Sequence, residues 1–70
     1  MNYMISTVRN GRPVVFPFIY DEEMFDFALT LPEEEWRNAT YYAVLAPEKL
    51  KDISDKWLDA IECELALMNR

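Results

Sequence analysis

The dipeptide Asn10-Gly11 constrains the fold of this chain more than any other feature of the sequence. It separates two segments that are rich in strand-forming residues, 3–9 and 12–20. Asn-Gly is strongly preferred in two-residue hairpin turns, because both central residues of such a turn adopt positive φ angles. We therefore expect the chain to begin with a β-hairpin.

The register of this hairpin decides which side chains enter the core. A two-residue turn sets Arg9 opposite Arg12, and every second residue from that pair lies on the same face. On that face we expect the core-facing side chains Tyr3, Ile5, Thr7, Val14, Phe16 and Phe18. Because Pro17 has no N–H to donate, the second strand should lie at an edge of the sheet or leave it there.

Two helix start signals follow the hairpin. Asp21 is a favourable N-cap, acidic residues follow it, and an apolar segment then continues to Leu31, which predicts a helix over residues 21–31. Leu31 precedes Pro32, and the residue before a proline avoids the helical conformation. Pro32 and the glutamates after it repeat the start signal, so a short helical turn is expected from residue 32.

Residues 39–46 are ambiguous, because the periodicity of a short apolar run does not separate a strand from a helix. The β-branched and aromatic residues in it favour a third strand over about 40–46. The alternative is a helix there, which would give a β-hairpin attached to a three-helix cluster.

The last part of the chain has the clearest helical pattern. After Pro47, apolar residues recur at helical spacing as far as Met68, which predicts a long helix over about 48–68. The expected fold class is therefore α+β, with this helix laid across a small antiparallel sheet. We expect residues 1–70 to form a single compact acidic domain.

Charge is sorted along the chain. The net charge is −6 with thirteen acidic residues, all of which follow residue 20, whereas Arg9 and Arg12 are the charged residues before it. On a helix over 48–68, five acids recur at steps of three and four and would share one side: Glu48, Asp52, Asp55, Asp59 and Glu62. The expected helix starts supply a second acidic cluster: Asp21, Glu22, Glu23, Asp26, Glu33, Glu34 and Glu35.

Missing residue types exclude several classes of function. The chain has no His, one Cys and one Gly, so it cannot form a Ser-His or Cys-His nucleophile pair, a typical zinc site, an internal disulfide or a Gly-rich phosphate loop. We therefore expect no enzymatic activity, no cofactor and no metal. With no secretory signal and no apolar run long enough to span a bilayer, a cytoplasmic location without membrane contact is expected.

Two functional hypotheses remain. In the first, the chain is an acidic protein-binding module, and in its sharper form a phage or mobile-element inhibitor that mimics nucleic-acid charge and blocks a basic host protein that binds nucleic acid. Direct nucleic-acid binding is not expected, because that requires clustered basic residues. Arg9 and Arg12 at the hairpin tip are a possible further contact. In the second hypothesis the chain forms a homodimer through its long helix, with Leu65 and Met68 in the contact and the acids as solvated surface.

Overall fold

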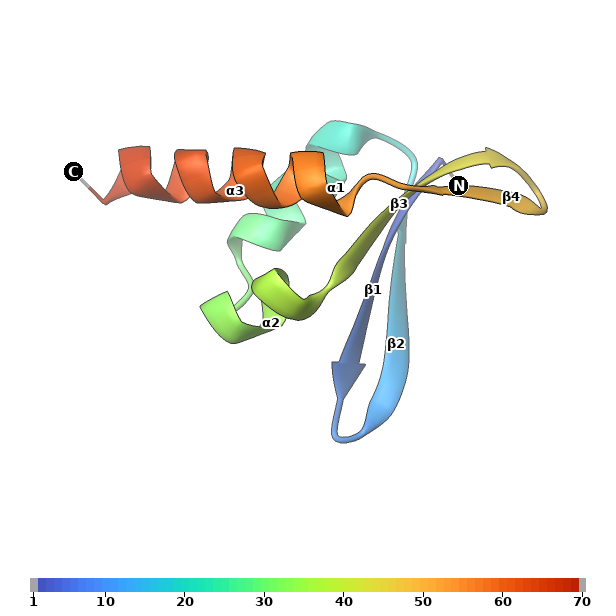
Figure 1. The fold of residues 1–70 in the computed structure, drawn as a ribbon, viewed down its shortest axis with the longest axis horizontal. Helices are drawn as coiled ribbons and strands as arrows, with labels where there is room; N and C mark the ends of the chain where they lie inside the picture. Colours follow the sequence, from blue (N-terminus) through green and yellow to red (C-terminus); the bar gives the residue numbers. More distant parts are fainter. Residues whose placement is uncertain (1, 70) are drawn as a thin grey trace.

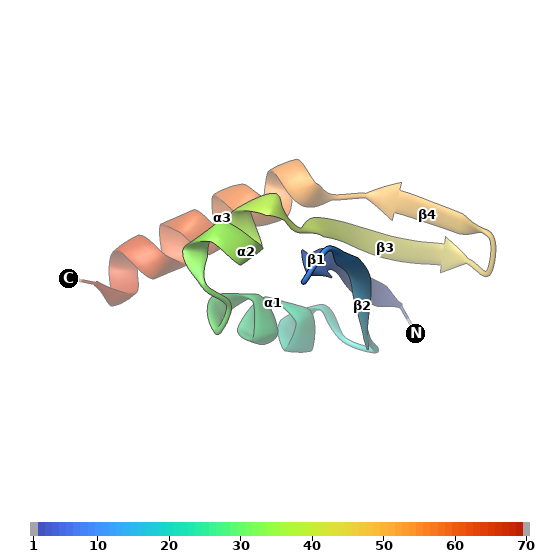
Figure 2. The same cartoon turned by 90° about the horizontal axis from the view of Figure 1, so that it is seen from below.

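The chain folds into a small α+β domain in which a four-stranded antiparallel sheet carries three helices on one face (Figures 1 and 2). The computed structural model describes residues 2–69. In chain order the elements are β1 (Tyr3–Arg9), β2 (Arg12–Phe18), α1 (Asp21–Leu29), α2 (Glu33–Asn38), β3 (Thr40–Ala46), β4 (Lys49–Asp52) and α3 (Ser54–Met68). The strand order in the sheet is β2-β1-β3-β4.

The expected hairpin is confirmed, including its register. Asn10 and Gly11 have φ angles of 54° and 75°, as a two-residue hairpin turn of the favoured type requires. Arg9 pairs with Arg12, and the core-face pairs are Tyr3 with Phe18, Ile5 with Phe16, and Thr7 with Val14. β2 lies at the edge of the sheet, as the proline in it predicts.

The core lies between the inner face of the sheet and the helices. Ile5 and Tyr41 contribute from adjacent strands, since they are paired across β1 and β3. The buried apolar cluster consists of Ile5, Met24, Ala28, Leu31, Trp36, Ala39, Tyr41 and Ile61. Each helix therefore presents at least one fully or nearly fully buried side chain to the sheet.

The helix that follows the hairpin is shorter than expected. α1 begins at Asp21, but Tyr20 is its N-cap residue, and the Glu23 carboxylate accepts a hydrogen bond from the Tyr20 backbone N–H at 3.3 Å. The helix ends at Leu29, because the chain must turn before Pro32, and Leu31 is buried in that turn.

Residues 40–46 form a strand, so the third strand is confirmed and the three-helix alternative is wrong. The sheet has one strand more than the sequence indicated. Residues 49–52 form β4, which pairs with β3. The pairing register shifts between Val44 and Ala46, as at a β-bulge. Pro47 starts a turn here and not a helix, since proline suits the second position of a turn as well as the first turn of a helix.

The helix predicted over 48–68 consequently begins at Ser54. The reason is that the edge of β3 needs a hydrogen-bonding partner, which β4 supplies. The C-terminal end of α3 extends away from the sheet, as both ribbon views show (Figures 1 and 2). No helix within the described part of the chain is long and apolar enough to cross a membrane.

Candidate functional site

The predicted row of five acids does not exist as one helical face. Glu48 lies in the turn between β3 and β4, and Asp52 is the last residue of β4. Asp55, Asp59 and Glu62 do lie on α3 and are exposed. The row is therefore wrong in its first two members, because α3 begins after them.

Asp52 is engaged in joining β4 to α3. Its Oδ1 accepts a hydrogen bond from the Ser54 backbone N–H at 2.8 Å. The Ser54 hydroxyl in turn accepts the Tyr41 backbone N–H at 2.9 Å. Hydrogen bonds from the Ser54 hydroxyl and from its backbone N–H hold the pKa of Asp52 below its ordinary value. The position of this carboxylate is explained by the local structure.

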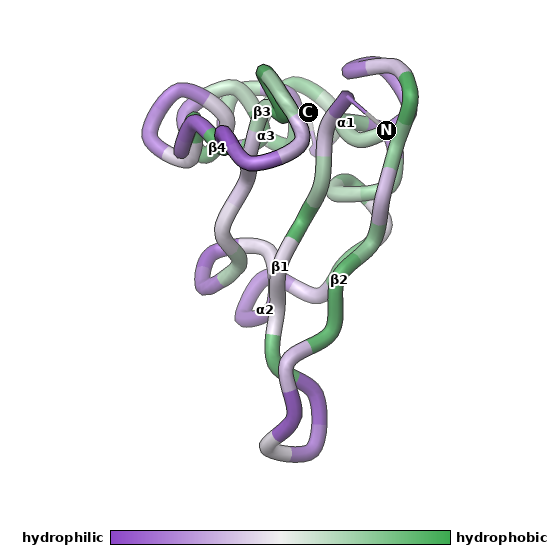
Figure 3. The backbone as a smooth tube through the Cα atoms, turned by 90° about the vertical axis from the view of Figure 1, so that its right-hand side faces the viewer, coloured by the Kyte–Doolittle hydropathy of each residue, from purple (hydrophilic) through white to green (hydrophobic). Residues whose placement is uncertain are grey.

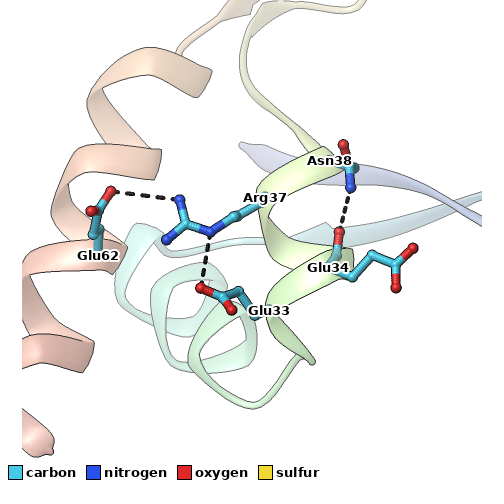
Figure 4. A network of polar contacts seen from close by, with 5 residues as sticks. All are labelled: Glu33, Glu34, Arg37, Asn38 and Glu62. Atoms are coloured by element: carbon cyan, nitrogen blue, oxygen red, sulfur yellow. Dashed lines mark hydrogen bonds and ion pairs between the residues drawn. The ribbon is translucent and has the colours of Figure 1, made fainter.

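The acids at the start of α2 are partly neutralised inside the domain. Arg37 Nε lies 3.1 Å from Glu33 Oε1, and Arg37 Nη1 lies 3.7 Å from Glu62 Oε2, so this arginine links α2 to α3 (Figure 4). The Arg37 guanidinium also lies 4.5 Å from the centre of the Trp36 ring. The backbone carbonyl of Glu34 accepts a hydrogen bond from the Asn38 side chain at 2.7 Å.

Arg9 at the hairpin tip is also bound within the domain. Its Nη2 lies 2.7 Å from Glu35 Oε1, and its guanidinium carbon lies 5.0 Å from the centre of the Phe16 ring. Its neighbour Arg12 is exposed. Arg9 therefore ties the hairpin to α2, and the contact with a partner expected at the tip stays a prediction.

A groove between α1 and α3 gathers acidic and aromatic side chains. It has a volume of about 400 Å³ and is lined by Asp21, Glu22, Phe25, Asp26, Lys56, Trp57 and Ala60. Phe25 and Trp57 are half-buried and meet edge to face, with their ring centres 5.6 Å apart. The three carboxylates all come from α1. Glu22 and Asp26 lie four residues apart, as do Asp21 and Phe25, so each pair shares a side of the helix.

The groove carboxylates differ from Glu33 and Glu35 of α2, which each have a cationic partner. No ion pair within residues 2–69 includes Asp21, Glu22 or Asp26. Lys56 is the one basic side chain lining the groove. Carboxylates beside aromatic rings can bind an ammonium or guanidinium group, through charge-assisted hydrogen bonds and cation–π attraction. Arg37 makes this combination of contacts inside the same domain, with Glu33 and the Trp36 ring.

The acids of this groove belong to a cluster that the sequence predicts, but the approach of α3 to them is not predicted. Asp21, Glu22 and Asp26 were predicted site residues, whereas Phe25 and Trp57 were not. The missed signal is the spacing of Phe25, which lies four residues after Asp21 and so on the same side of α1. The approach of Trp57 depends on tertiary packing.

The remaining predicted residues lie elsewhere. Glu23 lies outside the α1–α3 groove and binds the start of its own helix. Leu65 is partly buried and packs against the core, while Met68 is 62% exposed near the end of α3. The two residues of the predicted self-association contact therefore have different surroundings.

The described residues contain no group of three or more side chains arranged to hold a metal ion. Comparison of the chain with protein-family models, with curated proteins and with solved structures finds no match in any of the three.

Proposed function

We propose that this domain is a non-enzymatic binding module that takes a basic segment of a partner protein in the α1–α3 groove. The observation that carries the proposal is the combination of Asp21, Glu22 and Asp26, without cationic partners among the described residues, beside the half-buried rings of Phe25 and Trp57. A lysine or arginine side chain satisfies both halves of this site.

The charge distribution supports a basic partner over an acidic one. The chain carries a net charge of −6, and α1 and α2 both begin with three consecutive acids. These helix starts, with Asp55, Asp59 and Glu62 on α3, make the helical side of the domain strongly negative. Such a surface attracts cationic segments and repels nucleic acid itself.

In its sharper form the proposal names the partner class as a basic protein that binds nucleic acid. The acidic helical side would then occupy the groove in which that protein holds phosphates, as an inhibitor from a phage or mobile element would. In this version α1, α2 and α3 all contribute acidic residues to the contact. Glu48 and Asp52 are not among them, because both precede α3.

The test compares two variants that each remove three negative charges. The groove variant carries Asp21→Asn, Glu22→Gln and Asp26→Asn, and the α3 variant carries Asp55→Asn, Asp59→Asn and Glu62→Gln. Both are used beside the parent as tagged bait in pull-downs analysed by mass spectrometry, after circular dichroism has shown that they fold. A synthetic arginine-rich peptide, titrated while NMR signals of Phe25 and Trp57 are followed, gives a defined second readout.

We expect the groove variant to lose the basic partner and the peptide shifts, whereas the α3 variant keeps the peptide shifts and captures the partner less strongly than the parent. Binding should also weaken steeply as salt rises, because exposed charges form the contact. Equal loss in both variants would mean that overall charge and not the groove attracts the partner. Unchanged capture by both variants would refute the proposal.

A further inference from the structure

The outer face of the sheet is largely apolar, and no helix within residues 2–69 covers it. The pairing register places alternate residues of the four strands on this face: Met4, Ser6, Val8, Pro13, Val15, Pro17, Thr40, Tyr42, Val44, Leu50 and Asp52. Figure 3 views the domain from this side, with the sheet in front of the three helices. Antiparallel sheets with a solvated face normally carry polar residues there, so this face departs from the usual pattern.

Several of the apolar side chains on this face are exposed, whereas Met4, Tyr42 and Val44 are half-buried. Val8 is 67% exposed, Val15 is 49% exposed and Leu50 is 48% exposed. Asp52 is the one charged residue on the face, although 29% of the whole chain is charged. A large apolar patch of this kind on a small domain marks an interaction surface.

Both edges of the sheet are protected against the addition of another strand. β2 carries Pro13 and Pro17, which have no N–H to offer, and they alternate with residues that face the core. At the other edge β4 is only four residues long and carries Lys49 and Lys51, two features that discourage strand pairing. Association through the sheet must therefore use its face.

We propose that this face pairs two copies of the chain, so that two sheets stack with the helices of each copy outside. Charge restricts a contact between two copies to this face. Each copy carries −6 and repels another through its helical side, whereas the outer face brings almost no charge into the contact. Stacked sheets pack face to face about 10 Å apart, so two copies in this arrangement would bury their apolar side chains against each other.

The area predicts a weak dimer. Each side chain on a sheet face covers roughly 30 Å² in projection, so the face covers about 350 Å² per copy. Stable complexes bury about 800 Å² of accessible surface per partner, more than twice this projected area, so the dimer should be weak. Tyr42 sits between Met4 and Asp52 in the register, and a tyrosine within an interface is a typical anchor.

The test is sedimentation velocity on the full chain from about 1 µM to about 1 mM, at low salt and at about 1 M salt. Val8→Lys with Val15→Lys charges the sheet face at two exposed positions. Leu67→Lys with Met68→Lys is the matched control, because these residues are also exposed, at 58% and 62%, and lie at the end of α3.

We expect the parent to dimerise within this range, more readily at high salt because the acidic surfaces are then screened. The sheet-face variant should stay monomeric and the α3 variant should still dimerise. A parent that is monomeric throughout, or dimerisation lost only in the α3 variant, would overturn the proposal. If both variants are monomeric, isotope-filtered NMR on the parent decides. Contacts between Met4 of one copy and Tyr42 of the other would support the sheet-face dimer, and the absence of such contacts would overturn it.

This inference is independent of the groove. High salt should strengthen the sheet contact and weaken the binding of a basic segment, so the two proposals fail by different results.

Discussion

Replacing Ile61 with alanine tests how α3 is held on the domain. Among the described residues of this helix Ile61 alone is fully buried, with 0% of its surface exposed. Trp57, Leu58 and Leu65 pack around the same core but are only partly buried. Truncating a fully buried isoleucine to alanine costs about 2–5 kcal/mol, from lost apolar burial and the cavity left behind.

The loss is large relative to the stability of so small a domain. At the usual free energy per residue, 70 residues give about 4–10 kcal/mol of unfolding free energy. We expect Ile61→Ala to lower it by about 3 kcal/mol. With a urea dependence of about 1 kcal/mol per M for a chain of this size, the unfolding midpoint should fall by about 3 M.

The assay is urea unfolding followed by tryptophan fluorescence, which reports on this packing directly. Trp57 of α3 stacks on Tyr41 of β3, with ring centres 6.2 Å apart. Leu67→Ala is the matched control, because Leu67 is on the same helix and 58% exposed, and it should change the stability by less than about 0.5 kcal/mol. Equal effects of the two substitutions would refute the docking of α3 through Ile61.

Two further predictions concern single hydrogen-bonded groups. The buried Tyr41 hydroxyl donates to the Trp36 carbonyl at 2.8 Å, so Tyr41→Phe should cost about 1–2 kcal/mol in urea unfolding; an unchanged midpoint would contradict this. Burial raises the pKa of Tyr41 from 10.0 to about 12, so the parent should lose stability as pH rises through this interval, and the variant should lose less. Hydrogen bonds from Ser54 lower the pKa of Asp52. The ionised Asp52 carboxylate therefore stabilises the fold above the ordinary carboxyl pKa, and this stabilisation disappears as pH falls through the lowered pKa. Asp52→Asn should therefore flatten the acid side of the stability profile, and identical acid profiles would rule that contribution out.

The N-terminal hairpin followed from local chemistry. Asn10 and Gly11 favour one turn type, that turn sets Arg9 opposite Arg12, and the two-residue period of a strand then assigns each side chain to a face. Each step depends on neighbours in the sequence, so no knowledge of the rest of the molecule was needed.

The boundary between β4 and α3 could not be predicted from neighbouring residues in the sequence. Pro47 and Glu48 are equally compatible with a turn and with a helix start, and Leu50 continues the helical apolar spacing. The open edge of β3 decides the outcome, because residues 49–52 pair with it and give its backbone groups partners within the protein. For the same reason the five predicted acids do not form one row on α3, because Glu48 and Asp52 precede the helix.

For the candidate site, the sequence by itself determined the acidic helix starts, including Asp21, Glu22 and Asp26. Only the tertiary structure brought Trp57 beside Phe25 and left the outer face of the sheet uncovered. The physical reason is the range of the interactions. Turns, caps and strand alternation act between neighbouring residues, whereas grooves and exposed faces arise from the way distant elements pack to bury one shared core.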